Sequence, residues 1–214
     1  MDDYKDALKG RGDMYRLLGR LYLKEVDGDL LKLLKGTEFP EGSDNPKLAD
    51  GSAKLCEALA GISGDEASMD ELAADYAKAF LGAGQVTGEP VAFPIESVYT
   101  SGARLVAQDS YEDVYRIFRS EGLAKQDCDL FEDHLALEFA YMARLCGRAL
   151  EALEKGDEPA AEALVDEQAA FLKKHILNWA PAFCEDVRKC PIGPFYKAVS
   201  LVTQGWLELE QAAM

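Results

Sequence analysis

The sequence has little of the residue types that mark most metal and disulfide sites. Its 214 residues include two histidines, His134 and His175, and five cysteines at wide spacings with no C-x-x-C pair. A zinc knuckle or a disulfide framework needs closely and regularly spaced cysteines, so neither is expected. Reduced thiols are the simpler interpretation, and they are typical of a cytoplasmic protein.

Long apolar runs and nucleotide loops are also missing. No stretch approaches the roughly 18 apolar residues that cross a bilayer, and residues 1–6 lack the basic start and apolar run of a secretory signal. None of the patterns G-x-x-x-x-G-K-[ST], G-x-G-x-x-G or H-E-x-x-H occurs. We therefore expect a soluble cytoplasmic protein without cofactor, metal or membrane insertion.

Positive charge is scarce relative to negative charge. The chain has 39 acidic and 23 basic residues, which gives a net charge of −16. An acidic surface repels phosphate backbones, so nucleic-acid binding is not expected. The same field speeds the encounter with cationic peptides, although solubility alone also explains it. Hydrophobic residues make up 48% of the chain, which is enough for a folded core.

The apolar residues of the chain follow a helical pattern. Apolar residues recur at three- and four-residue spacing along most of the chain, and no alternating strand pattern competes. We predict an all-α fold, a single domain over residues 1–214 with about eight to ten helices. One expected helix is 97–108. Two further helices are expected to begin at capping boxes, Ser68–Glu71 and Asp129–Glu132.

Residues 82–95 form the most loop-like interior stretch. Glycines and two prolines, Pro90 and Pro94, exclude a regular element there. The loop is a candidate hinge between helices. Flanked by the prolines, Phe93 and Ile95 form either a preordered apolar surface or a packed crossover.

Asp133-His134 is the pair that most resembles a polar site. At a helix start, the dipole favours a negative Asp133 and a neutral His134. One interpretation is structural, with the pair capping and bracing helices. The other is a helical hydrolase or metal-dependent enzyme that uses this pair with Glu138 and Glu96. No nucleophile, ligand set or phosphate loop accompanies the pair, so we assign no catalytic residue.

Four further segments stand in this order: Tyr76-x-x-x-Phe80-Leu81-Gly82, Pro94-Ile95-Glu96-Ser97-Val98-Tyr99, Asp133-His134-Leu135-x-x-Glu138-Phe139-x-x-Met142, and His175-Ile176-Leu177-x-Trp179-x-Pro181-x-Phe183 followed by Phe195-Tyr196. Together they resemble the TorD/DmsD/NarJ family of cytoplasmic chaperones for molybdenum-containing redox enzymes. Glu132 stands where the family commonly has proline, and the loop after Phe80 is rich in glycine. These departures leave the client enzyme open.

The resemblance implies a peptide-binding chaperone and not an enzyme. Such a protein binds the twin-arginine leader or the apo form of a molybdopterin-dependent oxidoreductase, and assists cofactor insertion before export. An assembly factor that binds the enzyme body and ignores the leader is the alternative. The resemblance also implies a monomer or a domain-swapped dimer with its hinge at 82–95. The peptide-binding residues it implies are Tyr76, Phe80, Pro94, Glu96, Ser97, Tyr99, Asp133 and His134.

Each of these residues has an expected role. Asp133 and Glu96 are expected to form ion pairs or caps, and His134 is expected to form hydrogen bonds. The aromatic residues and Pro94 are expected to line the groove. Helical spacing alone places Tyr76 and Phe80 on the core face of a helix.

Overall fold

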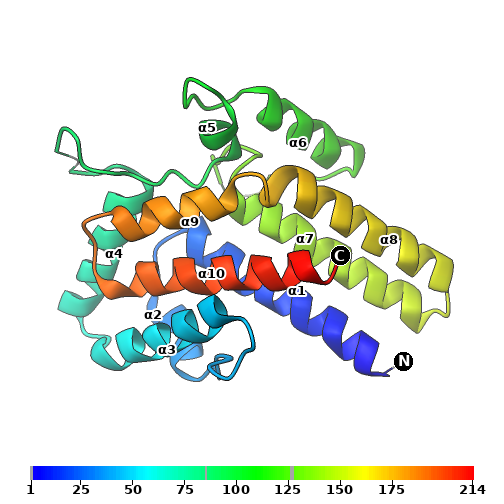
Figure 1. Ribbon diagram of the computed structural model, residues 1–214, viewed down its shortest axis with the longest axis horizontal. Coiled ribbons are helices and arrows are strands. Elements are labelled where there is room, and N and C mark those ends of the chain that lie inside the picture. The colour runs from blue at the N-terminus through cyan, green and yellow to red at the C-terminus, as the bar shows by residue number, and fades with distance from the viewer. Residues whose placement is uncertain (1, 85, 126–127) are drawn as a thin grey trace. The chain divides into compact units, whose positions relative to one another are not determined.

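The computed structural model describes residues 2–84, 86–125 and 128–214 (Figure 1). Its regular structure there consists of ten α-helices and one π-helix. The only β-type pairing within these ranges is an isolated bridge between Ile95 and His134. The all-α class predicted from the sequence is confirmed.

The chain divides into two compact units and passes from one to the other three times. The first unit consists of Met1–Leu23 and Ile95–Trp179, and the second of Lys24–Pro94 and Ala180–Met214. A single domain over residues 1–214 stays a prediction. So does the hinge at 82–95, of which residue 85 lies outside the described residues.

The first unit is built around two long antiparallel helices, α1 and α7. Leu18 and Tyr22 are buried on α1, and Phe139 is buried on α7. Glycine permits their close approach, since a Cβ on Gly19 would lie 3.2 Å from the Ala136 carbonyl oxygen. The helices of this unit are α1 (Asp2–Leu23), α5 (Glu96–Thr100), α6 (Asp109–Ser120), α7 (Leu135–Glu154), α8 (Glu158–Phe171) and the π-helix (Leu172–Ile176).

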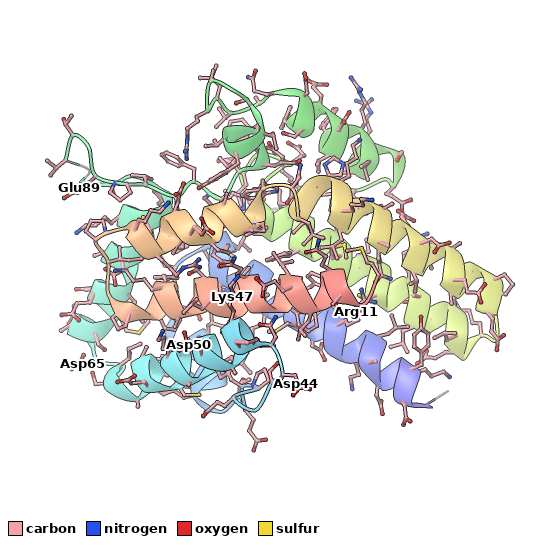
Figure 2. All side chains as sticks on the ribbon, in the orientation of Figure 1. Arg11, Asp44, Lys47, Asp50, Asp65 and Glu89 are labelled. Carbon is pink, nitrogen blue, oxygen red and sulfur yellow. The ribbon has the colours of Figure 1, made fainter. Side chains whose placement is uncertain are left out.

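The second unit is centred on the crossing of α3 and α10. A Cβ on Gly205 would lie 2.3 Å from the Leu48 backbone nitrogen, so only glycine fits there. At the start of α3, Lys47 (labelled in Figure 2) forms an ion pair with Glu208 of α10. The helices of this unit are α2 (Gly28–Lys35), α3 (Pro46–Gly61), α4 (Glu66–Phe80), α9 (Ala180–Lys189) and α10 (Pro194–Ala212).

Two predicted helix starts were wrong because neighbouring residues form the caps. The Asp65 side chain, at the start of α4 in Figure 2, accepts the Ser68 backbone N–H at 2.9 Å, so the helix begins before the predicted box. The long helix α7 begins at Leu135, after the predicted box Asp129–Glu132. Its N-cap is His134, and Asp133 and His134 therefore precede the first turn instead of lying within it.

The predicted helix 97–108 was also wrong, because α5 ends at Thr100. The backbone beyond it turns back on itself, and Arg104 and Ala107 both have positive φ angles, 53° and 55°. The Ser101 hydroxyl accepts the Leu105 backbone N–H at 2.9 Å and replaces a helical hydrogen bond. Side chains that bond to nearby backbone compete with the helix in this way.

Candidate functional site

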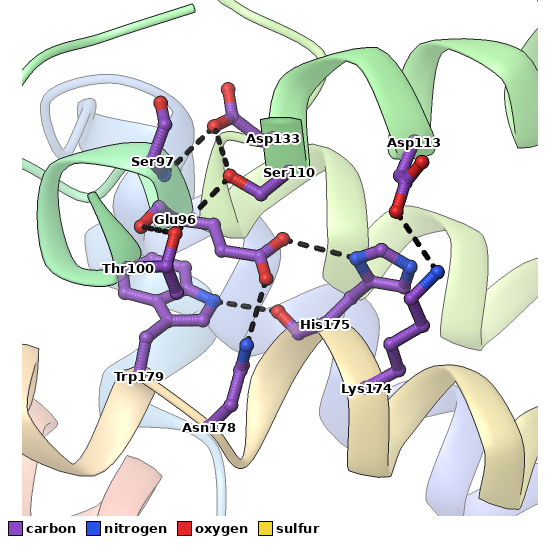
Figure 3. A network of polar contacts seen from close by, with 10 residues as sticks. All are labelled: Glu96, Ser97, Thr100, Ser110, Asp113, Asp133, Lys174, His175, Asn178 and Trp179. Carbon is purple, nitrogen blue, oxygen red and sulfur yellow. Dashed lines mark hydrogen bonds and ion pairs between the residues drawn. The ribbon is translucent and has the colours of Figure 1, made fainter. Parts of the chain in front are cut away.

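A buried polar cluster connects α5, the segment before α7 and the π-helix (Figure 3). Its centre is Glu96, whose side chain is 2% exposed. One carboxylate oxygen lies 3.1 Å from His175 Nδ1, and the other accepts the Asn178 amide N–H at 2.9 Å. We call Glu96, Asp133, Glu138, His175 and Asn178 the Glu96 cluster.

The π-helix presents His175 to Glu96. The Leu177 backbone N–H reaches back five residues to the Leu172 carbonyl, at 2.9 Å, and widens the turn. The carbonyl of His175 accepts the indole N–H of Trp179 at 2.6 Å, so the backbone of this turn is held as well. Such wide turns are frequent at functional sites.

Asp133 holds the start of α5. Its carbonyl accepts the Glu96 backbone N–H at 2.8 Å, and its carboxylate accepts the Ser97 backbone N–H at 2.9 Å. The Ser110 hydroxyl lies 3.5 Å from the same carboxylate oxygen and connects α6 to this point (Figure 3). Asp133 therefore fixes two elements, and its carboxylate faces the protein interior.

Burial controls the charges of these groups. It raises the pKa of Asp133, although the hydrogen bonds from Ser97 act in the opposite direction. Burial also raises the pKa of Glu138 well above its usual range, and the negative charges of Glu96 and Asp133 add to this. Burial lowers the pKa of His134 to about 4, which keeps its ring neutral. The sequence predicted the neutral histidine, but burial rather than the helix dipole is the main cause.

A polar pocket of about 570 Å³ opens beside the cluster. Asp113 bonds Lys174 at 3.0 Å across its rim, and this hydrogen bond lowers the pKa of the aspartate and keeps it ionised. Asp109 is exposed at the same rim. The pocket is lined by Glu96, Thr100, Ser101, Gly102, Gln108, Asp109, Ser110, Asp113, Lys174, His175 and Asn178.

Five of the eight predicted peptide-binding residues lie in the first unit. Glu96, Ser97, Asp133 and His134 come together around the Ile95–His134 bridge. Tyr99 packs its ring against Trp179, with 5.5 Å between the ring centres. Of the four residues at the bridge, Glu96 is the one that lines the polar pocket.

The other three residues, Tyr76, Phe80 and Pro94, lie in the second unit, and all three are buried. The rings of Tyr76 and Phe80 lie 5.1 Å apart, and both pack against Tyr196. Their position on the core face of α4 confirms the helical spacing. A role for them in lining a groove stays a prediction.

Sequence reasoning did not assign His175, Asn178 or the rim aspartates to a site. His175 lies in one of the four segments that resemble the family, and this position was the signal in the sequence that could have placed it in the site. Its partner Glu96 is 79 residues away, and a single sequence does not show such a pairing.

Among the described residues, no group of three or more histidine, cysteine or acidic side chains is placed to hold a metal ion. The His134 ring nitrogen Nδ1 accepts the Ala136 backbone N–H at 3.1 Å, so it is occupied as a helix cap. Within the same residues, no helix is long and apolar enough to span a bilayer.

Comparison with known proteins matches the chain to one family and to relatives that share one name. Residues 43–185 match the family described as nitrate reductase delta subunit. A protein from Shewanella loihica named Chaperone protein TorD is 29% identical, with 99% of this chain and 96% of the relative covered. Its namesakes from Shewanella pealeana (28% identical, 92% and 86% covered) and Vibrio cholerae (24% identical, 99% and 94% covered) are also similar. The Glu96 cluster lies within the matched range.

Proposed function

The chain belongs to the nitrate reductase delta subunit family, which includes the TorD- and NarJ-type chaperones, and we propose that it is a cytoplasmic chaperone for a molybdenum-containing oxidoreductase. In this proposal it binds the twin-arginine leader of the client and keeps the apoenzyme competent for cofactor insertion before export. The relatives named as chaperones support this class of function.

The polar pocket is the observation that carries the proposal. Its rim has two aspartates, and the acidic chain as a whole attracts cationic segments. A guanidinium pairs with a carboxylate through two parallel hydrogen bonds, so paired carboxylates suit paired arginines. An incoming arginine competes with Lys174 and Arg116 for Asp113, which is accessible at the rim.

The buried residues serve this pocket indirectly. Glu96 contributes to its wall but already bonds His175 and Asn178. Asp133 and His134 accept backbone N–H groups and face inward. Asp133 positions α5 and α6 at the pocket and His134 caps α7, while Asp109 and Asp113 contact the peptide.

A titration of the full-length protein with a fluorescent leader peptide tests this assignment. The peptide is taken from the molybdopterin oxidoreductase whose gene lies nearest. We expect the double variant Asp109→Asn and Asp113→Asn to bind at least tenfold more weakly, because both charges that face the arginines are lost. The matched control is Asp157→Asn with Asp50→Asn, at exposed positions elsewhere. Equal affinity of the rim variant and the control would refute the assignment.

Binding to the enzyme body is the second candidate function. The family description, a subunit of nitrate reductase, favours it, because it names a protein that associates with an enzyme. Co-purification of the chain with leader-deleted apoenzyme distinguishes the two. Recovery equal to that of the intact apoenzyme supports body binding, and loss of recovery supports dependence on the leader.

A further inference from the structure

Two hollows lie on the outer face of α7, within the first unit. One hollow of about 550 Å³ lies along α1 and α7, which run side by side in Figure 1. Another of about 540 Å³ lies between α6, the following loop and α7. Leu137, Ala140 and Arg144 line both hollows, so the two adjoin along the outer face of α7, and together they are called the groove.

The charge of this groove is opposite to that of the chain as a whole. Two acidic side chains, Glu132 and Glu151, line it, and Glu132 is paired with Lys125 at 3.2 Å. Arg144 is exposed at the centre. The cations that line the groove, which we call the basic face, are Arg16, Arg20, Arg119, Lys125, Arg144 and Arg148.

Several of these cations have partners, Lys125 and Arg119 among them. Arg16 pairs with Asp13 and Arg148 with Glu121, each at 2.6 Å. These pairs reduce the local charge but keep the guanidinium groups in place. On a chain of net charge −16, a groove with more cations than carboxylates is a local reversal of sign. Such a reversal attracts acidic segments that the rest of the surface repels.

The shape of the groove suits a helix. Small residues form its floor, among them Ala140 and Gly147, and they allow a partner backbone to come close. From Leu137 to Glu151 the floor extends about 21 Å at 1.5 Å per residue, or roughly four helical turns. In the second hollow, Tyr115 and Phe118 add an apolar wall.

We propose that the basic face docks an acidic amphipathic helix of a partner protein. The apolar side of that helix contacts the small residues and rings, and its carboxylates face the arginines on either side. This partner differs from a twin-arginine leader, which is basic and which the arginines repel. The proposal therefore stands independently of leader binding.

Two synthetic helical peptides of about 18 residues, long enough for four turns, provide the probe. They share one leucine and alanine face, and their polar faces carry glutamate in one and lysine in the other. We expect the full-length protein to bind the glutamate peptide saturably at low salt and to lose it as salt rises. The net charge alone predicts the reverse preference, so preferential binding of the lysine peptide overturns the proposal.

Variants map the site. Arg119→Glu with Arg144→Glu is expected to weaken binding of the glutamate peptide at least tenfold, while Lys32→Glu with Lys173→Glu, an equal change of charge elsewhere, leaves it intact. Ala140→Trp fills the groove and is expected to weaken binding of the glutamate peptide as much as the arginine changes do. Ala170→Trp, at an exposed position of α8, is expected to leave binding unchanged. Equal effects of the paired variants overturn the proposal.

A small anion is the competing occupant. Pyrophosphate is titrated against the complex of the protein and the glutamate peptide at constant ionic strength. If pyrophosphate displaces the peptide at micromolar concentration and Ala140→Trp leaves peptide binding unchanged, the groove is a small-anion site and the proposal is wrong. Displacement only at the concentration that matches simple salt supports the helix.

Discussion

Individual side chains of the Glu96 cluster and its neighbours respond differently to burial. His134 becomes harder to protonate, whereas Asp133 and Glu138 become harder to ionise. Burial disfavours the charged form in each case, and the sign of the pKa change follows from which form is charged. The stability of the fold therefore depends on pH through buried groups that no ligand needs to touch.

Glu138→Gln tests this dependence. In the unfolded chain this carboxyl loses its proton near pH 4.5, whereas the folded protein retains the proton to a higher pH because its pKa is raised. Its contribution to stability is therefore complete below pH 4.5 and is lost as the pH rises towards the folded pKa.

We expect the wild type to lose more stability than Glu138→Gln between pH 5 and pH 8, by up to about 1.4 kcal/mol per pH unit for one proton. Urea unfolding across this range measures the difference. Parallel pH profiles of the two proteins would show that Glu138 ionises normally in the fold.

His134 provides a test of capping. Asparagine is among the best N-cap residues, so His134→Asn is expected to retain the bond to the Ala136 backbone. His134→Ala removes it and is expected to cost about 1 kcal/mol more than the asparagine variant. Free energies of unfolding measure both. If the two variants lose the same stability, the ring acts through packing and not as a cap.

At the scale of helices, backbone contact decides where glycine is required. The crossing of α3 and α10 has no room for a side chain at Gly205, whereas Gly147 on the outer face of α7 has nothing within 4 Å of its Cβ position. The same residue type thus permits close packing at one position and only weakens the helix at the other.

Alanine substitutions separate these two cases. Gly205→Ala is expected to destabilise the fold by about 1–3 kcal/mol, because the α3 backbone must move away. Gly147→Ala is expected to stabilise it by about 0.5–1 kcal/mol through helix propensity. Thermal or urea unfolding of both variants measures the contrast. A stable Gly205→Ala protein would mean that the helices are farther apart than described.

The helices were predictable to different degrees. Apolar spacing predicted an all-α fold, and α1 and α10 each bury a continuous stripe of this kind. It failed at 97–108, where the Ser101 hydroxyl and two positive φ angles end α5. It also missed the π-helix, because a turn of five residues leaves the apolar pattern nearly unchanged. The Glu96 cluster depends on pairs of residues that are far apart in sequence. Of its members, only Glu96 and Asp133 were among the predicted peptide-binding residues.

For the whole molecule, charge is distributed unevenly. The chain has a net charge of −16. Within the first unit, Asp109 and Asp113 near the start of α6 form an acidic rim, whereas the basic face combines Arg119 at the end of α6 with α1 and α7. The two surfaces suit partners of opposite charge. Both interactions are expected to weaken with salt, because the charges are exposed and screened.

The affinity for the client leader tests the central claim most directly. The dissociation constant is measured at fixed low salt for the native leader and for one with both arginines replaced by glutamine. The account predicts saturable one-to-one binding of the native leader and at least tenfold weaker binding of the substituted one. Equal affinity for the two peptides, or no binding of the native leader, would contradict it.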